Sequence, residues 1–274
     1  MAALKSTIKK SLRALHLYEP VHQIWSHRPD LRMLLWNSGY RIYGAGDHMP
    51  IPPAKLISFT NNSREISWFL HTGMISFNCL CNALEKNQYF LENFHNVLDF
   101  GCGCGRVLRF WHNIKGVHIF GSDYNPALIN WDKSHLSRMA NFQINFLAPP
   151  LNYPNNFFDL IYALSVFTHF PEDLQLAWMD ELYRVLETNG LLLITLHGKS
   201  RMLELNQEQK ARFLEGKMVV THAESAGENL CGSYYPVEYV RNSLARKFEL
   251  VDFIESGARD SNQDIYLLRK PIPQ

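Results

Sequence analysis

The chain has 274 residues, 46% of them hydrophobic and 13% aromatic, so it is long and apolar enough to bury a large core. Its 27 lysines and arginines nearly balance 26 aspartates and glutamates, and this net charge of +1 gives no reason to expect nucleic acid as a partner. No apolar run reaches the roughly 20 residues of a membrane span, and no apolar signal-peptide core follows the start, so we expect a cytoplasmic protein with reduced cysteines.

Residues 1–20 have a basic, amphipathic pattern. Leucines and an isoleucine recur at helical spacing with four basic residues among them, and no acid precedes Glu19. Such a helix can pack on the domain, lie in a membrane interface or act as a targeting peptide. We expect a surface helix, with peripheral membrane contact through it as a second interpretation.

Residues 1–95 are mostly helical in pattern and form an N-terminal extension, or cap, before a domain over 96–274. A loop over 43–55 interrupts them. The spacing of apolar residues predicts a long helix over 63–87, with Ser63 as its N-cap.

From residue 96 short strands alternate with helices. The strands are predicted over 96–101, 118–123, 142–147, 158–167 and 191–196, and the helices over 106–113, 125–139 and 171–190, the last closed by Gly190. This alternation implies a parallel sheet in an open, doubly wound α/β domain, which binds ligands at the carboxyl ends of its strands. Two further strands are predicted over 248–256 and 263–270, after a polar insertion over about 199–246 that could form a lid.

The stretch "LDFGCGCGR" (98–106) raises three interpretations. A zinc site built from its two cysteines with Cys79 and Cys81 is disfavoured, because zinc ligands are usually paired two to four residues apart, and we expect no metal. A dinucleotide loop has the spacing G-x-G-x-x-G, whereas this one places Arg106 where the third glycine should be.

The acid before the glycines, Asp99, discriminates between a dinucleotide and S-adenosylmethionine as the ligand. Asp99 would repel a pyrophosphate but suits a ligand with an ammonium beside a carboxylate, as in S-adenosylmethionine. Asp123 lies 22 residues after Gly101, at the end of the next strand, where a carboxylate accepts ribose hydroxyls. The pair favours the sulfonium cofactor.

The sequence resembles the class I S-adenosylmethionine-dependent methyltransferases, densely over 96–197 and loosely in the last strands. "VLDFGCGCGR" is similar to their first motif, "FGSDYNPALI" to the second, and "YPNNFFDLIYALSVFTHF" and "MDELYRVLETNGLLLITLHG" to the segments around strands four and five. The resemblance implies a Rossmann-like, mostly parallel seven-stranded sheet and S-adenosylmethionine as the cofactor.

The resemblance also implies the cofactor-binding residues. These are Asp99, Gly101, Cys102, Gly103, Arg106, Asp123, Tyr124 and Ser165, together with Leu147 and Ala148 beside the adenine. The acid that the family usually has at the adenine is missing here, so the backbone amides of Leu147 and Ala148 would hold the ring, with Asn145 two places earlier. Arg106 is either a neighbour of the cofactor carboxylate or a solvated residue.

Methyl transfer to a hydroxyl needs an oriented acceptor and a base, and histidine titrates near neutrality. His169 follows strand four at the carboxyl edge, His197 follows strand five, and His71 lies in the helix before the domain. Each is a candidate catalytic residue or a structural one. Trp68, Tyr234 and Tyr235 are candidates for the acceptor pocket.

We therefore expect a methyltransferase acting on a small-molecule, glycan or lipid-linked acceptor, with oxygen preferred. An NAD-type oxidoreductase on the same fold and a non-catalytic adenosyl-binding scaffold are the alternatives. The sequence does not indicate the oligomeric state.

Overall fold

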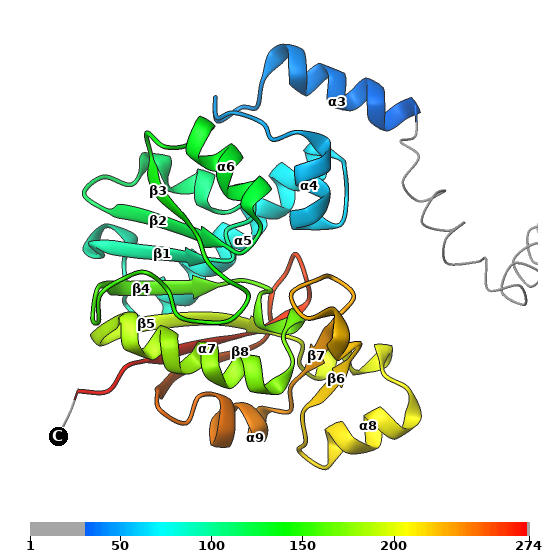
Figure 1. Ribbon diagram of the computed structural model, residues 1–274, viewed down its shortest axis with the longest axis vertical. Helices are drawn as coiled ribbons and strands as arrows, with labels where there is room; N and C mark the ends of the chain where they lie inside the picture. The colour runs from blue at the N-terminus through cyan, green and yellow to red at the C-terminus, as the bar shows by residue number, and fades with distance from the viewer. Residues whose placement is uncertain (1–30, 273–274) are drawn as a thin grey trace, which may run out of the picture.

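The computed structural model describes residues 31–272, so the helix expected over residues 1–20 lies outside the described residues. A seven-stranded sheet organises the chain in the order β3-β2-β1-β4-β5-β9-β8 (Figure 1). Its strands are β1 Asn96–Phe100, β2 His118–Asp123, β3 Ala140–Ile144, β4 Phe158–Ala163, β5 Leu186–Leu196, β8 Glu249–Ala258 and β9 Gln263–Arg269. The five strands from β1 to β5 are parallel, and β9 is antiparallel to both β5 and β8. The expected doubly wound, mostly parallel seven-stranded sheet is confirmed.

The helices cover both faces of the sheet. They are α3 Leu31–Tyr43, α4 Ala54–Asn61, α5 Ile66–Lys86, α6 Pro126–His135, α7 Glu172–Val185, α8 Gln207–Leu214 and α9 Val237–Tyr239, with a π-helical turn over Val240–Leu244. One core cluster joins α5 and α6 to the first face, and a second joins α7 and α9 to the other. Because α5 shares this core, it is an integral cover of the sheet. The apolar β4 is buried on both faces, as a central parallel strand should be.

Several predicted boundaries are wrong. The helix expected over 171–190 ends at Val185, because Leu186 already pairs with Phe158, and Gly190 lies inside β5. The helix expected over 106–113 is a 3₁₀ helix over Leu108–Asn113. The third strand, expected over 142–147, ends at Ile144.

The long helix α5 is confirmed, but its N-cap is not Ser63. Glu65 occupies that position without a side-chain cap bond, and the free amide of Ile66 donates instead to Asn37 Oδ1 of α3, at 2.9 Å. The orphan donor of the first turn is thus satisfied by a distant element.

The insertion after β5 forms a separate small unit. It contains α8 and the hairpin β6 Val219–Thr221 with β7 Gly232–Tyr234, beside the carboxyl ends of β4 and β5 in Figure 1. Short 3₁₀ turns complete the chain at Leu91–Asn93, Phe167–His169, Lys199–Glu204 and Ala223–Ser225. The loop between β6 and β7 returns over the sheet edge where a ligand is expected.

Candidate active site

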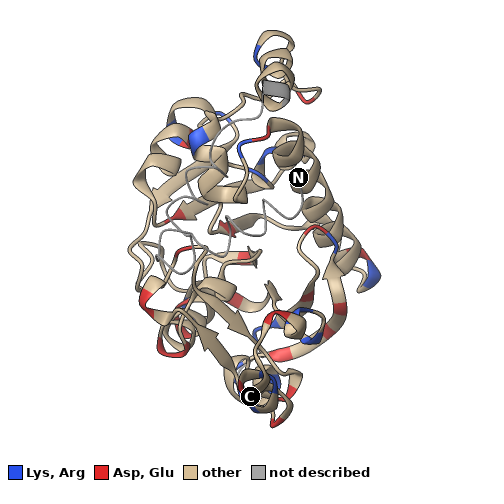
Figure 2. Ribbon diagram, turned by 90° about the vertical axis from the view of Figure 1, so that its right-hand side faces the viewer, with Lys and Arg blue, Asp and Glu red and all other residues tan. Residues whose placement is uncertain are grey.

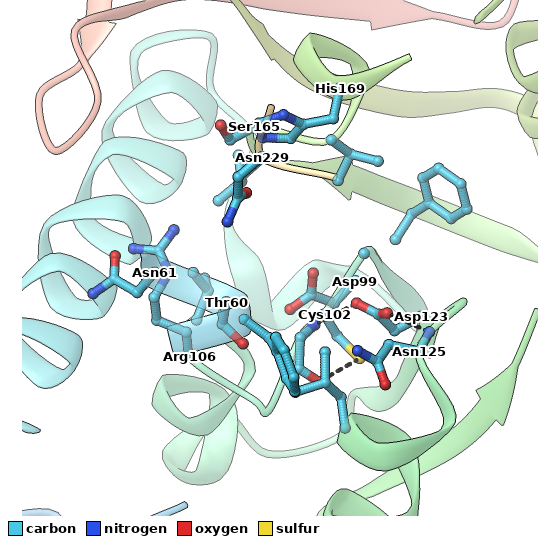
Figure 3. Close-up of a pocket in the computed structure, with 18 of the residues that line it drawn as sticks. Thr60, Asn61, Asp99, Cys102, Arg106, Asp123, Asn125, Ser165, His169 and Asn229 are labelled. Carbon is cyan, nitrogen blue, oxygen red and sulfur yellow. Dashed lines mark hydrogen bonds between the residues drawn. The ribbon is translucent and has the colours of Figure 1, made fainter. Parts of the chain in front are cut away.

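A cavity of about 670 Å³ lies at the carboxyl ends of β1, β2 and β4. Its position is the one expected for a ligand of a doubly wound sheet, and its volume suits a cofactor-sized molecule. Figure 3 shows two groups of residues facing each other across it: Asp99, Cys102, Asp123 and Asn125 on one side, and Ser165, His169 and Asn229 on the other.

The glycine loop joins β1 to the cavity. Gly101 N and Cys102 N both donate to the carbonyl of Ser122 in β2, at 2.8 and 3.0 Å. Gly103 has φ +60°, and a Cβ there would lie 2.5 Å from Thr60 Cγ2 of α4. A Cβ at this position would strain the backbone and force the side chain of Thr60 to shift, so glycine is the residue that suits it.

Asp123 holds the glycine loop as well as facing the cavity. Its Oδ2 accepts from Gly103 N at 3.0 Å and its Oδ1 from Asn125 N at 2.8 Å. Burial raises the pKa of this carboxyl, and the two backbone hydrogen bonds partly oppose the rise. Each oxygen keeps a further lone pair, so the expected contact with ribose hydroxyls fits the geometry.

Asp99 offers the cavity an unpaired acceptor. Its side chain is buried, and Oδ2 has no hydrogen-bond partner within residues 31–272. Burial raises its pKa to about 7, Asp123 adds to the rise, and a hydrogen bond with Tyr162 and the charge of Arg106 oppose it. A buried carboxyl with a free oxygen is the feature that an ammonium group would satisfy, so these residues fit the amino-acid part of S-adenosylmethionine.

The two loop cysteines are buried, and Cys102 also lines the cavity. Cys102 Sγ lies 3.9 Å from Asp132 Oδ2, behind the loop. Burial, followed by the charges of Asp123 and Asp99, raises the pKa of Asp132 to about 9, and burial with the nearby acids raises the pKa of the Cys102 thiol well above its ordinary value. In the described part of the chain, no three His, Cys, Asp or Glu side chains are grouped to hold a metal ion.

Leu147 and Ala148 do not line the cavity. Both are exposed, and the carbonyl of Leu147 accepts from Trp178 Nε1 at 2.9 Å. Asn145 lines it instead, with a buried Oδ1 that has no partner within the described residues. Asn145, which directly follows the end of β3 at Ile144, thus takes the place at the cavity that the resemblance implied for Leu147 and Ala148.

Arg106 is neither solvated nor free. Its Nη1 lies 3.2 Å from Asp260 Oδ2 and donates to Ser76 Oγ at 2.9 Å, while Ser76 Oγ donates to Asp260 at 2.7 Å. The three side chains link the glycine loop, α5 and the turn between β8 and β9 around the cavity. Arg106 therefore positions the wall and contributes a cation to it.

Ser165 lies at the cavity in a strained backbone conformation, with φ +60°. Its amide donates to Thr195 Oγ1 at 2.7 Å, and its hydroxyl accepts from Gln263 Nε2 at 2.7 Å. Thr195 in turn donates to Gln263 Oε1, which closes a network across the ends of β4, β5 and β9. The conformation also explains why β4 ends at Ala163 and not at residue 167.

His169 is the one of the three candidate histidines that lines the cavity. Its Nδ1 lies 3.0 Å from the carbonyl oxygen of Cys231, and its own carbonyl accepts from Gly227 N at 2.7 Å. Burial lowers its pKa, and hydrogen bonds to the backbone of Cys231 and Glu228 partly oppose this. A carbonyl only accepts, so Nδ1 carries the proton and Nε2 keeps a lone pair in the neutral ring.

The structure does not bring His197 or His71 to the cavity. His197 is buried beneath the insertion with Nδ1 3.1 Å from Ser233 O and its ring 5.1 Å from that of Tyr234, and burial lowers its pKa to about 3. His71 is exposed on α5. Tyr235 is a core residue whose hydroxyl donates to Phe167 O at 2.6 Å.

Of the three aromatic residues expected in the acceptor pocket, Trp68, Tyr234 and Tyr235, only Trp68 lines the cavity. Tyr234 lies outside the cavity, with its hydroxyl 3.0 Å from Glu204 Oε2, whereas Trp68 lines the cavity and is half exposed.

The insertion supplies residues that sequence reasoning missed. Gly227, Glu228 and Asn229 line the cavity, and the hydroxyl of Tyr124 donates to Gly227 O at 2.8 Å. Together with the bonds of His169, this fastens the loop between β6 and β7 over the site. The sequence marked the insertion as a lid but contained no signal for which of its residues face inward.

Comparison with known proteins gives the family. The family model described as "Methyltransferase domain" matches residues 76–246, which is more than half of the chain. The chain belongs to the class I S-adenosylmethionine-dependent methyltransferases. Its cofactor is S-adenosylmethionine, and the free oxygen of Asp99 and the glycine loop fit that molecule.

Two curated relatives share part of this methyltransferase. Phosphoethanolamine N-methyltransferase of Plasmodium falciparum is 28% identical over 121 residues, 41% of this chain and 45% of the relative. Malonyl-[acyl-carrier protein] O-methyltransferase of Enterobacter lignolyticus is 28% identical over 120 residues, 44% of this chain and 46% of the relative. The chain thus spans about half the length of the curated relatives it matches.

Solved methyltransferases share the fold. A methyltransferase of Methanosarcina mazei superposes with a TM-score of 0.52 at 20% identity, over 69% of this chain and 98% of that one. Human N-acetylserotonin methyltransferase, solved with S-adenosylmethionine, gives a TM-score of 0.52 at 18% identity, over 81% and 57%. At these identities the likeness concerns the fold alone.

Proposed function

We propose that this methyltransferase transfers the methyl group of S-adenosylmethionine to an oxygen atom of a small-molecule, glycan or lipid-linked acceptor. The observation that carries the choice of oxygen is the position of His169, a neutral histidine at the cavity with Nδ1 held by the carbonyl of Cys231. A hydroxyl needs a base to take its proton, and the Nε2 lone pair of this neutral ring can accept that proton.

The residues divide the work in the following way. When bound, S-adenosylmethionine supplies a methyl group already activated on a sulfonium. Asp99 would hold its cationic amine at the free Oδ2, Asp123 would accept hydrogen bonds from its ribose hydroxyls, and Asn145 would accept one from its adenine amino group. His169 Nε2 takes the proton from the acceptor hydroxyl as the oxygen–methyl bond forms. The loop fastened by Tyr124 and His169 excludes water.

The rest of the cavity favours an uncharged, hydroxyl-bearing acceptor. Phe59 and Trp68 give it aromatic surface, and Asn61, Asn62 and Asn229 give it amides that both donate and accept. Its cation is paired: Arg106 faces Asp260. Within the described residues the cavity therefore offers no free cation to a phosphate or carboxylate, and this supports the glycan or neutral small-molecule option.

The proposal includes a cytoplasmic location and, for a lipid-linked acceptor, contact of residues 1–20 with a membrane surface. The basic, acid-poor sequence of that segment supports the second part.

A transfer assay tests the function. The full chain is incubated with trideuteromethyl S-adenosylmethionine and separated small-molecule, glycan and lipid fractions, and products are read by mass spectrometry. We expect a deuterated methyl ether or ester in one fraction, formed with S-adenosylhomocysteine, and much slower formation by His169→Ala. A labelled amine or carbon product would refute oxygen transfer. Binding of NAD in place of S-adenosylmethionine would favour the oxidoreductase, and cofactor binding without any product would favour the scaffold.

A further inference from the structure

Helix α3 turns an apolar face to solvent. Leu35, Trp36, Ile42 and Tyr43 are 67%, 58%, 73% and 88% exposed. Leu34, at 46%, continues the same side of the helix. Single exposed apolar residues are ordinary, but five on one side of a ten-residue stretch mark an interaction surface. We call these five residues the α3 face.

The opposite side of α3 is anchored to the domain, so α3 is not a detached helix. Asn37 Nδ2 donates to Arg64 O at 2.9 Å, and Arg41 Nη1 donates to Ile51 O at 2.6 Å. Tyr40 packs against the main core cluster. Residues 37, 40 and 41 share one side of a helix, which leaves the α3 face pointing outward.

The α3 face carries no charge. From Met33 to Tyr43 the one charged residue is Arg41, on the anchored side. Figure 2 accordingly draws α3, the helix at its upper end, almost wholly in tan. The composition of leucine, isoleucine, tryptophan and tyrosine is that of a helix lying in a membrane interface.

The charge along the sequence is strongly one-sided. Residues 1–64 contain nine lysines and arginines against three acids, a net charge of +6, so the remaining 210 residues carry −5. One of the three acids, Asp47, is paired with Arg109 at 2.6 Å. The near-neutral total conceals a basic N-terminal region that would be attracted to an anionic surface.

We infer that the α3 face docks on an anionic lipid bilayer. A second copy of the chain would bring the same basic N-terminal sequence, and a nucleic acid would not bury leucine and isoleucine. A bilayer with acidic headgroups satisfies both the apolar face and the charge. None of the helices in residues 31–272 is long and apolar enough to cross the membrane.

The docked face would lie next to the cavity. Helices α3 and α4 both contact α5. Phe59 of α4 and Trp68 of α5 are half exposed and line the cavity. The inference goes beyond the proposed function and does not depend on which acceptor is used.

Vesicle sedimentation of the full chain tests it, with phosphatidylcholine vesicles lacking or containing phosphatidylglycerol. We expect binding to the anionic vesicles that weakens as salt is raised. The variant L35Q/W36Q/I42Q should bind them at least about tenfold more weakly. The matched control L203Q/L214Q, which changes two side chains 82% and 70% exposed on the insertion, should bind like the unchanged protein.

Unchanged binding of S-adenosylmethionine, measured by calorimetry, would show that both variants are folded. None of these five residues lines the cavity. Failure of the unchanged protein to bind anionic vesicles would overturn the inference. So would equal binding by the α3 variant, or a dimer seen by light scattering that the α3 substitutions abolish while vesicle binding persists.

Discussion

Asp99 should make cofactor affinity depend on pH in the neutral range. Its buried carboxyl has a pKa of about 7 in the free protein, raised first by desolvation. Only the ionised carboxylate can pair with an ammonium group. At pH values where Asp99 is protonated, binding of S-adenosylmethionine must therefore displace the proton of its carboxyl. Asp99→Asn keeps the shape of the side chain and removes the ionisation.

The size of the effect follows from that pKa. About one tenth of the Asp99 carboxyl is ionised one pH unit below its pKa and about nine tenths one unit above, so affinity should fall about tenfold, or 1.4 kcal/mol, from about pH 8 to about pH 6. Two other buried groups keep their protonation state in this window. Asp132, with a pKa of about 9, keeps its proton, and His197, with a pKa of about 3, stays neutral.

Stability should change in the opposite sense. Because the folded pKa of Asp99 is raised, its ionisation opposes folding, and its contribution becomes less favourable as pH rises from about 4 to about 7. The upper limit of this loss is about 4 kcal/mol. Above pH 7, Asp99→Asn should therefore melt at a higher temperature than the unchanged protein without ligand, while binding the cofactor at least about tenfold more weakly.

Isothermal titration across this range, in two buffers of different ionisation enthalpy, measures both affinity and proton release. We expect proton release below pH 7 that disappears in Asp99→Asn, with an affinity in the variant that no longer depends on pH. A flat affinity in the unchanged protein, or the same pH dependence in the variant, would refute the assignment of Asp99 to the cofactor amine.

Three further substitutions test other parts of the site. Gly103→Ala places a Cβ 2.5 Å from Thr60 and should weaken cofactor binding at least about tenfold. The control Gly116→Ala, with φ +82° and nothing within 4 Å of the added Cβ, should leave the titrated affinity unchanged. Equal losses of affinity in the two variants would contradict the close fit at Gly103. His169→Ala should preserve affinity and slow transfer by about 10²- to 10⁴-fold, and undiminished turnover would exclude it as the base. Tyr124→Phe releases Gly227 O and should raise the KM for the acceptor several-fold with kcat little changed, as steady-state kinetics would show.

The sheet was predictable because its signals are local. Each parallel strand is a short apolar run, and β4 is buried on both faces as its sequence indicates. The acids Asp99 and Asp123 were also predictable, because a strand end places a residue at the sheet edge whatever packs around it. Both line the cavity.

The errors arose where pairing between distant segments overrides local preference. Gly190 is a typical helix terminator, but the carbonyl of Gly190 accepts from Lys270 N, which extends β5 back through it. The resemblance implied that Leu147 and Ala148 lie at the ligand, whereas in the structure Asn145 lines the cavity and those two residues do not. The partner of Arg106, Asp260, lies 154 residues further along the chain, and no sequence spacing predicts such a pair.

Titration of the full chain with S-adenosylmethionine is the most direct test of the account. We expect one site with a dissociation constant of micromolar order, and loss of that binding in Asp123→Ala, because the carboxylate both holds Gly103 and faces the cavity. A folded protein that takes up no S-adenosylmethionine, or an Asp123→Ala variant that binds it with unchanged affinity, would contradict the site described here.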